Sequence, residues 1–291
     1  MLAESKLEIR TETVNIDEME AFHDVKLGRR LAAIAAEDNL AEVNAHSAPV
    51  TPRRSFYTRW GKRTLDIGIS GLALLVTAPI NLALGVGTFL DVGRPIFFRQ
   101  QRTGLDGKPF TIVKFRNMTN AVDAEGNLLP ANERVTKLGK FVRRTSLDEL
   151  LNFWSIFKGD MSLIGPRPLS PVYDCRYSRR HAMRSAVRPG LECPILNCPD
   201  HEPTWVDQFE NDVYYVEHLS LGLDLRMILA LVGMVLNKES TTVRGAATRG
   251  SFMGYYPDGT VINSHSVPAA YVERVLAEEE ERVKREVVIA R

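Results

Sequence analysis

The sequence predicts an α+β protein that is mostly helical, with a helix–break–helix segment that re-enters a membrane and a small domain containing a short β-hairpin. An uncharged run of 24 residues, 67–90, is long enough for a membrane helix and contains Pro79, which removes a helical hydrogen bond. Residues 95–116 alternate as two strands around a central turn, the pattern of a β-hairpin. Residues 147–157 form an apolar stretch long enough for a helix.

Composition limits the class of protein. The 291 residues include 37 basic and 36 acidic side chains and are 44% hydrophobic, so the chain can bury a core in one or two domains. Three cysteines, without a cleavable signal peptide, indicate free thiols in a reducing compartment. The sequence contains no Gly-x-Gly-x-x-Gly or Walker loop, which argues against a Rossmann or P-loop nucleotide site.

Charges on both sides of the uncharged run favour one topology. Basic residues precede the run at 53–63 and follow it at 94–102. The positive-inside rule places both flanks on the cytoplasmic side, which favours a re-entrant segment over a spanning helix or a buried core helix. Asp66 at its start is expected to pair with Lys62 or Arg63, because an unpaired carboxylate is costly in lipid.

The second strand of the predicted hairpin carries two cations. In the alternation of residues 110–116, Lys114 and Arg116 lie on one face, and Asp106 and Gly107 supply the preceding turn. We expect both cations to face one site. The alternative is an exposed edge strand whose charges prevent pairing with other strands.

Residues 140–168 carry the strongest chemical signal. Ser146 is a candidate N-cap, so Asp148 and Glu149 are expected in the first turn of a helix. Such a site favours a phosphate or a divalent cation beside the carboxylates, although acids in a first turn also occur as simple caps. The 165–168 loop holds one arginine between two prolines, which suits a guanidinium held at a set angle. The cations expected around the carboxylates are Lys114, Arg116, Arg143, Arg144 and Arg167.

Two other features suggest binding. Residues 172–187 are basic and predict a helix that lies on anionic lipid headgroups; no RNA- or DNA-binding signature accompanies them, so no nucleic-acid partner is expected. Cys193, Cys198 and His201 are candidate metal ligands. Their spacing is not that of a standard zinc knuckle and prolines interrupt it, so a zinc site is not expected.

Taken in order, the motifs resemble one family, the bacterial sugar transferases, which are monotopic phosphoglycosyltransferases. The resemblance covers residues 62–237. It rests on Lys62-Arg63-x-x-Asp66, Gln101-Arg102-x-Gly104, Lys114-Phe-Arg116-x-Met118, Arg143-x-x-Ser146-Leu-Asp148-Glu149-Leu, Lys158-Gly-Asp-Met-Ser162, Gly165-Pro-Arg-Pro-Leu169, Arg188-Pro-Gly190 and Asp212-Val-Tyr-Tyr. Two positions depart from the family pattern. Ala78 replaces a serine before the proline, and Leu191-Glu-Cys-Pro follows Arg188-Pro-Gly190 where Ile-Thr-Gly is common.

This resemblance implies transfer of a sugar phosphate from a nucleotide diphosphate-sugar, usually a UDP-sugar, to polyprenyl phosphate, giving polyprenyl diphosphate-sugar and a nucleoside monophosphate. Asp148 corresponds to the nucleophile that forms an acyl-phosphate intermediate and to a ligand of Mg²⁺, the implied cofactor, while Glu149 assists. The implied phosphate-binding cations are Lys114, Arg116, Arg143, Arg167 and Arg188. The implied location is the cytoplasmic face of the bacterial inner membrane, in contact with lipids, where the reaction initiates cell-surface glycan or exopolysaccharide assembly.

The resemblance also divides the chain. Residues 1–52 and 238–291 are extensions expected to contact a second copy in a homodimer, 53–92 form the re-entrant membrane segment, and 93–237 form the catalytic domain. An inactive membrane scaffold and a Mg²⁺-dependent nucleotide-sugar pyrophosphatase remain as alternatives. The scaffold would have no use for mutually repelling charges held together, and the pyrophosphatase would not require polyprenyl phosphate.

Overall fold

The computed structural model describes residues 12–23, 25–124, 126–196, 202–236 and 249–289, and these are mostly helical. The helices are α2 (Val25–His46), α3 (Lys62–Val92), α4 (Ala131–Arg134), α5 (Lys137–Arg144), α6 (Asn152–Lys158), α7 (Arg179–Ala182), α8 (Trp205–His218), α9 (Leu221–Leu236) and α11 (Ala269–Ile289). Shorter helical turns are η1 (Ile16–Glu18), η2 (Glu20–His23), η3 (Tyr57–Gly61), η4 (Leu105–Gly107), η5 (Leu147–Glu149), η6 (Pro171–Arg176) and η7 (Met183–Ala186).

The strands form small sheets, which confirms a mostly helical α+β fold. They are β1 (Thr13–Val14), β2 (Phe97–Thr103), β3 (Pro109–Phe115), β4 (Ser162–Ile164), β5 (Gly190–Glu192), β6 (Phe252–Tyr255), β7 (Val261–Asn263) and β8 (Val267–Pro268). Within the described ranges they pair two by two, as β1-β8, β2-β3, β4-β5 and β6-β7.

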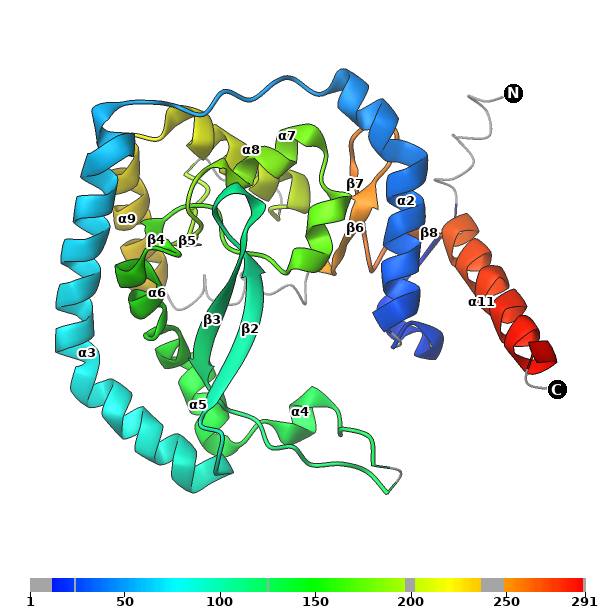
Figure 1. The fold of residues 1–291 in the computed structure, drawn as a ribbon, viewed down its shortest axis with the longest axis horizontal. Helices are drawn as coiled ribbons and strands as arrows, with labels where there is room; N and C mark the ends of the chain where they lie inside the picture. Colours follow the sequence, from blue (N-terminus) through cyan, green and yellow to red (C-terminus); the bar gives the residue numbers. More distant parts are fainter. Residues whose placement is uncertain (1–11, 24, 125, 197–201, 237–248, 290–291) are drawn as a thin grey trace.

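The apolar run forms α3. This helix of 31 residues continues through Pro79, and Figure 1 shows it descending along one side of the molecule and then turning beneath it. The expected break is therefore a bend inside one helix, because proline removes a single ladder hydrogen bond while the turns on either side keep theirs. Near the bend, the Thr77 hydroxyl donates to the carbonyl of Ala73 at 2.7 Å.

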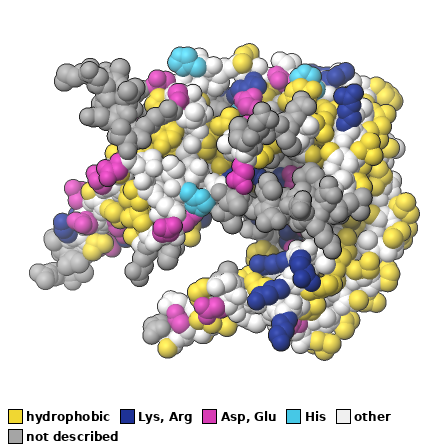
Figure 2. Space-filling view, turned by 180° about the vertical axis from the view of Figure 1, so that it is seen from behind, with side chains coloured by type: hydrophobic (Ala, Val, Ile, Leu, Met, Phe, Trp, Pro, Cys, Tyr) yellow, Lys and Arg dark blue, Asp and Glu magenta, His cyan; other side chains and the backbone are white. Residues whose placement is uncertain are grey.

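The surface of α3 is apolar. Together with η3 it is the one helix in the described part of the chain that is long and apolar enough to cross a membrane. Its large side chains are mostly outside the core: Leu72, Leu75 and Leu90 are 64%, 76% and 77% exposed. Figure 2 shows hydrophobic side chains along the edge that α3 forms.

Buried polar contacts attach the start of α3 to the rest of the molecule. Asp66 accepts hydrogen bonds of 3.0 Å from the hydroxyl of Ser162 and from the next backbone amide. Lys62 instead forms an ion pair of 2.7 Å with Asp224 on α9, and Arg63 donates to the last carbonyls of α6. In the described residues no direct ion pair joins Asp66 to Lys62 or Arg63, although the charge of Lys62 acts on Asp66. Groups distant in sequence supply the direct contacts of all three residues.

The predicted hairpin is confirmed. β2 and β3 pair antiparallel, with Phe98 opposite Lys114 and Arg102 opposite Phe110. Asp106 and Gly107 make the turn with positive φ angles of 55° and 72°, a conformation that aspartate tolerates and glycine adopts freely.

The predicted helix over 147–157 is wrong at its start. The chain forms the 3₁₀ turn η5 and then α6, and Ser146 is left-handed (φ 54°, ψ 21°) without a side-chain capping bond. Asp148 and Glu149 therefore lie in a tight turn before the α-helix rather than in its first turn.

The predicted basic helix over 172–187 is also wrong. The segment divides into η6, α7 and η7. Arg176 and Arg184 are buried at 5% and 4% exposure, and Arg180 pairs with Glu210 at 2.6 Å. These arginines bind within the protein, so they do not form a lipid-facing stripe.

Segments from both ends of the chain form one unit. α2 packs against β6 and α11, and β1 pairs with β8, as Figure 1 shows on the side opposite α3. The core of this unit contains Leu31, Ile34, Met253, Ile262 and Val275. A second cluster, Val43, Tyr177, Trp205, Phe209, Phe252 and Tyr255, joins the unit to α8 and the segment before α7. The described parts of the two extensions thus pack against each other and against the domain between them.

Candidate active site

Two carboxylates and two cations meet beside the hairpin. Lys114 Nζ on β3 lies 3.6 Å from Asp148 Oδ2 and 3.3 Å from Glu149 Oε1. Arg167 Nη2 lies 2.8 Å from the same oxygen of Glu149. We call Lys114, Asp148, Glu149 and Arg167 the carboxylate–cation cluster.

Close backbone packing positions Arg167. β4 and β5 run parallel, with Ser162 opposite Gly190 and Ile164 opposite Glu192. A Cβ on Gly165 would lie 2.5 Å from the carbonyl oxygen of Arg188, and one on Gly190 would lie 2.2 Å from the nitrogen of Gly165. Only glycines permit this approach, and it brings the loop containing Arg167 against β5.

The cluster favours the ionised form of Glu149. Burial opposes the charge of Glu149, but Arg167 and Lys114 outweigh it and hold the pKa of this carboxyl below its ordinary value. Asp148 is buried at 9% exposure with Lys114 as its cation. At neutral pH the cluster therefore presents Glu149 as an anion beside two cations that a phosphate could also bind.

Lys114, Glu149 and Arg167 of the cluster line a narrow cleft of about 50 Å³. Three polar residues that the sequence did not assign to the site line it as well: Gln100, Arg102 and Asn152. Burial and the nearby charge of Arg167 lower the pKa of Arg102. Two guanidiniums that repel each other at one cleft indicate a site for an anion. Arg102 could have been identified from its motif, Gln101-Arg102-x-Gly104.

Asn152 follows the two carboxylates on α6 and has an unusual oxygen. The residue is 5% exposed, and its buried Oδ1 has no hydrogen-bond partner among the described residues. An orphaned buried oxygen is unfavourable unless a ligand supplies its partner. No sequence signal identified this residue, because its position depends on the turn between η5 and α6.

Three predicted cations make their contacts elsewhere. Arg116 donates to the carbonyls of Val92 and Arg94 at the end of α3. Arg143 donates to Asn117 Oδ1 at 2.8 Å, and the Nε of Arg188 donates to the carbonyl of Gly159 at 3.0 Å. The structure therefore does not bring Arg116 to the face of Lys114, because β3 ends at Phe115 and the strand alternation stops there.

The candidate zinc ligands are only partly visible. Cys198 and His201 lie outside the described residues, and Cys193 is buried with Asn211 donating to its carbonyl at 2.9 Å. Among the residues that the structure describes, no three His, Cys, Asp or Glu side chains are grouped to hold a metal ion.

Comparison with known proteins identifies the family. The bacterial sugar transferase profile matches residues 57–238. The uncharacterised sugar transferase EpsL of Bacillus subtilis is 39% identical over 193 residues, which are 66% of this chain and 96% of EpsL. A UDP-glucose:undecaprenyl-phosphate glucose-1-phosphate transferase of Klebsiella pneumoniae is 35% identical over 182 residues, 59% of this chain. A UDP-N-acetylgalactosamine-undecaprenyl-phosphate N-acetylgalactosaminephosphotransferase of Aeromonas hydrophila is 30% identical over 224 residues, 74% of this chain.

Coverage of the relatives differs. The matched regions are 39% of the Klebsiella protein and 52% of the Aeromonas protein, whereas they are nearly all of EpsL. The family profile spans the whole carboxylate–cation cluster, from Lys114 to Arg167. This chain belongs to the bacterial sugar transferase family.

Proposed function

We propose that this protein transfers a sugar phosphate from a UDP-sugar to polyprenyl phosphate, giving polyprenyl diphosphate-sugar and UMP. The observation that carries the proposal is the carboxylate–cation cluster, in which Lys114 and Arg167 hold Glu149 beside the buried Asp148. The reactions named for the Klebsiella and Aeromonas relatives support the donor and the acceptor class. As the first step in building a lipid-linked glycan, this reaction would initiate cell-surface glycan or exopolysaccharide assembly.

Asp148 is proposed as the nucleophile. One of its carboxylate oxygens attacks the phosphorus that bears the sugar, the bond from that phosphorus to the UMP oxygen breaks, and UMP leaves with the electron pair. An oxygen of polyprenyl phosphate then attacks the same phosphorus and restores the carboxylate. Lys114, 3.6 Å from Asp148, is placed to balance negative charge as the two anions approach.

Glu149 and the guanidiniums have complementary roles in this proposal. Arg167 and Arg102 bind the phosphates of the donor at the cleft. A phosphate that engages Arg167 and Lys114 competes with Glu149 for them, and the pKa of Glu149 then rises from its lowered value. Glu149 thereby becomes a better proton acceptor for the incoming lipid phosphate only when substrate is bound.

The site also fits Mg²⁺. This ion prefers oxygen ligands and is commonly bound by one or two carboxylates together with substrate phosphates, rather than by a full protein cage. Asp148 and the orphaned Oδ1 of Asn152 are the oxygens that would hold it. Bound there, the ion would neutralise charge on the diphosphate during transfer.

We place the enzyme on the cytoplasmic face of the membrane, with α3 as a re-entrant segment. The exposed apolar side chains of α3 support burial in lipid. Basic residues on both flanks support a common side for its two ends. The change of direction of α3 in Figure 1, in a helix that contains Pro79, supports a return to that side. The acceptor phosphate would then meet the cluster at headgroup depth.

The proposal is tested with the full chain in detergent or nanodiscs. A panel of UDP-sugars is incubated with and without polyprenyl phosphate, and UMP and lipid products are measured. We expect continuous UMP release only when the lipid is present, and none from Asp148→Asn. Continuous release without lipid would show a pyrophosphatase, and no release under any condition would show an inactive scaffold.

A further inference from the structure

One face of the β2–β3 hairpin lines the cleft beside the carboxylate–cation cluster. Because side chains alternate along a strand, Gln100 and Arg102 share one face of β2. Gln100 is opposite Ile112 on β3, and all three residues line the cleft. Gln101 lies on the other face, where it donates to the hydroxyl of Thr111 at 3.0 Å. The hairpin therefore presents an amide and a guanidinium together at the cleft.

Arg102 is held by a neutral group. Its Nη2 donates to the side-chain oxygen of Gln100 at 2.7 Å. A guanidinium has donors only, so the amide must turn its oxygen toward Arg102, and its two N–H donors are left for another acceptor. The hydrogen bond is exposed and its own strength is modest. Its effect is to fix the position of a positive charge without neutralising it.

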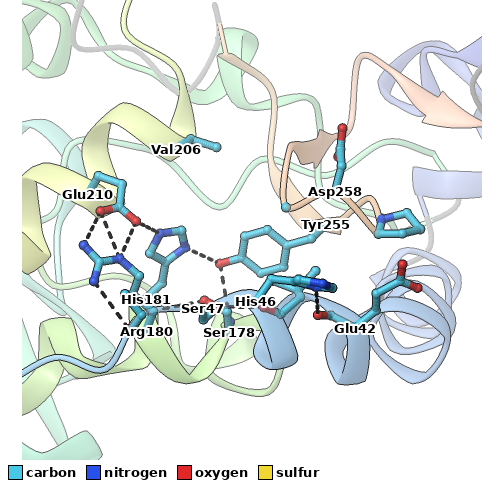
Figure 3. Close-up of a pocket in the computed structure, with 14 residues that line it drawn as sticks. Glu42, His46, Ser47, Ser178, Arg180, His181, Val206, Glu210, Tyr255 and Asp258 are labelled. Carbon is cyan, nitrogen blue, oxygen red and sulfur yellow. Dashed lines mark hydrogen bonds and ion pairs between the residues drawn. The ribbon is translucent and has the colours of Figure 1, made fainter.

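Elsewhere in the protein, carboxylates neutralise arginines. Arg180 forms an ion pair of 2.6 Å with Glu210, one of the contacts drawn as dashed lines in Figure 3. Arg184 forms an ion pair of 2.7 Å with Asp212. Within the described residues, the guanidinium of Arg102 forms no ion pair with an Asp or Glu side chain. Its charge is therefore left for a ligand.

The other two cations of the cleft already have carboxylate partners. Lys114 and Arg167 both contact Glu149, and Arg167 also contacts Glu192. Arg102 instead feels repulsion, since burial and the charge of Arg167 lower its pKa. An anion that binds between Arg102 and Arg167 removes this repulsion, so Arg102 is the cation of the cleft with most to gain from a phosphate.

Both charge and position favour the donor over the lipid acceptor. A nucleotide diphosphate-sugar brings two charged phosphates to two guanidiniums, whereas polyprenyl phosphate brings one. The hairpin begins beside the end of α3 and leads away from it (Figure 1). At ~3.4 Å per residue, Arg102 lies about 17 Å along the strand from Phe97. A phosphate that arrives from solution reaches this end of the hairpin without passing α3.

We infer that Gln100 and Arg102 form a binding pair for the diphosphate of the donor, in which Arg102 contacts a phosphate and Gln100 is the positioning residue of Arg102. The pair engages the donor while Arg167 is still held by Glu149 and Glu192. The identity of the donor rests on the proposed function. Binding at the pair needs no turnover, so it can be measured separately from the reaction.

The test measures the Kd for UDP by calorimetry, using the full chain in nanodiscs without lipid acceptor. Gln100→Glu keeps the size of the side chain but gives Arg102 a carboxylate partner, and we expect the Kd to rise at least about fivefold. Gln101→Glu is the matched control, with the same change of charge on the opposite face of β2. It should change the Kd less than about twofold. Thermal unfolding within a few degrees of wild type shows that both variants are folded.

Gln100→Leu tests whether Gln100 acts through Arg102. It removes the hydrogen bond without adding a charge, and we expect the Kd for UDP to rise about two- to fourfold. The same substitution should have no further effect in an Arg102→Gln background, where no cation remains to be positioned. In steady-state assays, Gln100→Glu should raise KM for the UDP-sugar and leave kcat and KM for polyprenyl phosphate within about twofold of wild type.

Four results would each overturn the inference. They are absence of UDP binding by wild type, an unchanged Kd in Gln100→Glu or an equal rise in Gln101→Glu, an effect of Gln100→Leu that persists without Arg102, and an increase of KM confined to polyprenyl phosphate. Failure of the proposed function gives a different pattern. Wild type would then bind UDP and Gln100→Glu would weaken this binding, but neither protein would release UMP in response to lipid.

Discussion

The guanidinium of Arg167 connects Glu149 to a second carboxylate, with Nη2 at 2.8 Å from Glu149 and Nη1 at 3.3 Å from Glu192. Glu192 lies on β5, directly after Arg188-Pro-Gly190 and Leu191. Its side chain is 14% exposed, and the side chain of Arg167 is 44% exposed, so the pair is only partly screened by water. Glu192 therefore withholds part of the positive charge that Arg167 would offer to a substrate phosphate.

Glu192→Gln should bind the donor more tightly. Removing the carboxylate frees Arg167 for the diphosphate. We expect KM for the UDP-sugar to fall about three- to tenfold, the effect of roughly 1 kcal/mol, because the side chain of Arg167 is 44% exposed and water weakens the pair. Initial rates at saturating lipid acceptor measure KM. An unchanged or higher KM would show that Glu192 instead orients Arg167 productively.

Substitutions of Asp148 and of Glu149 should reduce turnover by different amounts, because the two carboxylates have different roles. Asp148→Asn should lose turnover by on the order of 10³-fold or more, because binding energy does not replace a covalent nucleophile. Glu149→Gln should lose about 10²- to 10⁴-fold, as for a proton acceptor. Circular dichroism and thermal unfolding are the folding controls. A folded Asp148→Asn enzyme with near-normal UMP release would exclude the proposed nucleophile.

The covalent route also predicts a partial reaction. Without acceptor, wild type should release one equivalent of UMP per enzyme and stop, and polyprenyl phosphate should then discharge the stored sugar phosphate as lipid product. Double-reciprocal plots at several acceptor concentrations should be parallel, because UMP leaves before the second substrate binds. Intersecting lines without an initial UMP release would assign Asp148 to metal binding or proton transfer only.

Asn152 should affect the metal requirement. Asn152→Ala removes the orphaned oxygen, so we expect several-fold weaker Mn²⁺ binding by electron paramagnetic resonance and a higher Mg²⁺ concentration for half-maximal rate. Asn152→Asp should retain binding because it keeps an oxygen at that position. Asn211→Ala is the control, since Asn211 contacts Cys193 outside the cleft. Equal Mn²⁺ affinity in all four proteins would exclude Asn152 as a ligand.

Features that depend on local sequence patterns could be predicted from the sequence. Alternation and an Asp-Gly turn located the hairpin, and the uncharged run located α3. Lys114 lies beside Asp148 and Glu149, as the sequence predicted. All three residues belong to short sequence motifs that were recognised without knowledge of the fold. Contacts that depend on where a strand ends could not be predicted. Arg116 binds the backbone at the end of α3 because β3 stops one residue before it.

Long-range packing could not be predicted in the same way. Asp66 bonds to Ser162, 96 positions away, rather than to the lysine one turn before it. The positive charges of residues 172–187 suggested a lipid-facing surface. Arg184 is instead buried in the core, where Asp212 pairs with it at 2.7 Å. Assembly of the two extensions into one unit likewise depends on apolar contacts between α2 and α11 that neither segment reveals alone.

The contact between the unit formed by both ends of the chain and the region that matches the family, residues 57–238, should be sensitive to acid. Burial opposes ionisation of Glu210, but hydrogen bonds from His181 and Arg180 outweigh it and lower its pKa from 4.5 to about 2. The ionised folded form therefore adds stability above about pH 4.5, and this stability is lost as pH falls toward 2. Because the Glu210 side chain is 40% exposed, the effect should be no more than ~1 kcal/mol.

Glu210→Gln provides the comparison. At pH 6 the Tm of wild type should be a few degrees higher than that of Glu210→Gln. This difference should shrink as the pH decreases from about 4.5 toward 2. A difference between wild type and Glu210→Gln that is constant with pH would contradict the role of the Glu210 charge.

The bend at Pro79 should determine membrane topology. Single cysteines at Ser55 and Arg99, in a chain without the three native cysteines, should both resist an impermeant thiol reagent in intact cells and react after permeabilisation. Both positions lie beside the basic flanks of α3, so a re-entrant helix keeps them on the cytoplasmic side. Labelling of one position alone in intact cells would establish a spanning helix.

Pro79→Ala then tests whether the bend itself enforces this arrangement. Alanine restores the helical hydrogen bond and removes a cost of about 3 kcal/mol for a straight helix. The straight form of α3, with 31 residues, is long enough to cross the hydrocarbon core. We expect position 99 to react with the reagent in part of the variant population. Transferase activity should fall in the same proportion, because in those molecules the carboxylate–cation cluster leaves the cytoplasmic headgroup layer. Ala78→Ser is the matched control: it leaves Pro79 in place and should keep both cysteines protected.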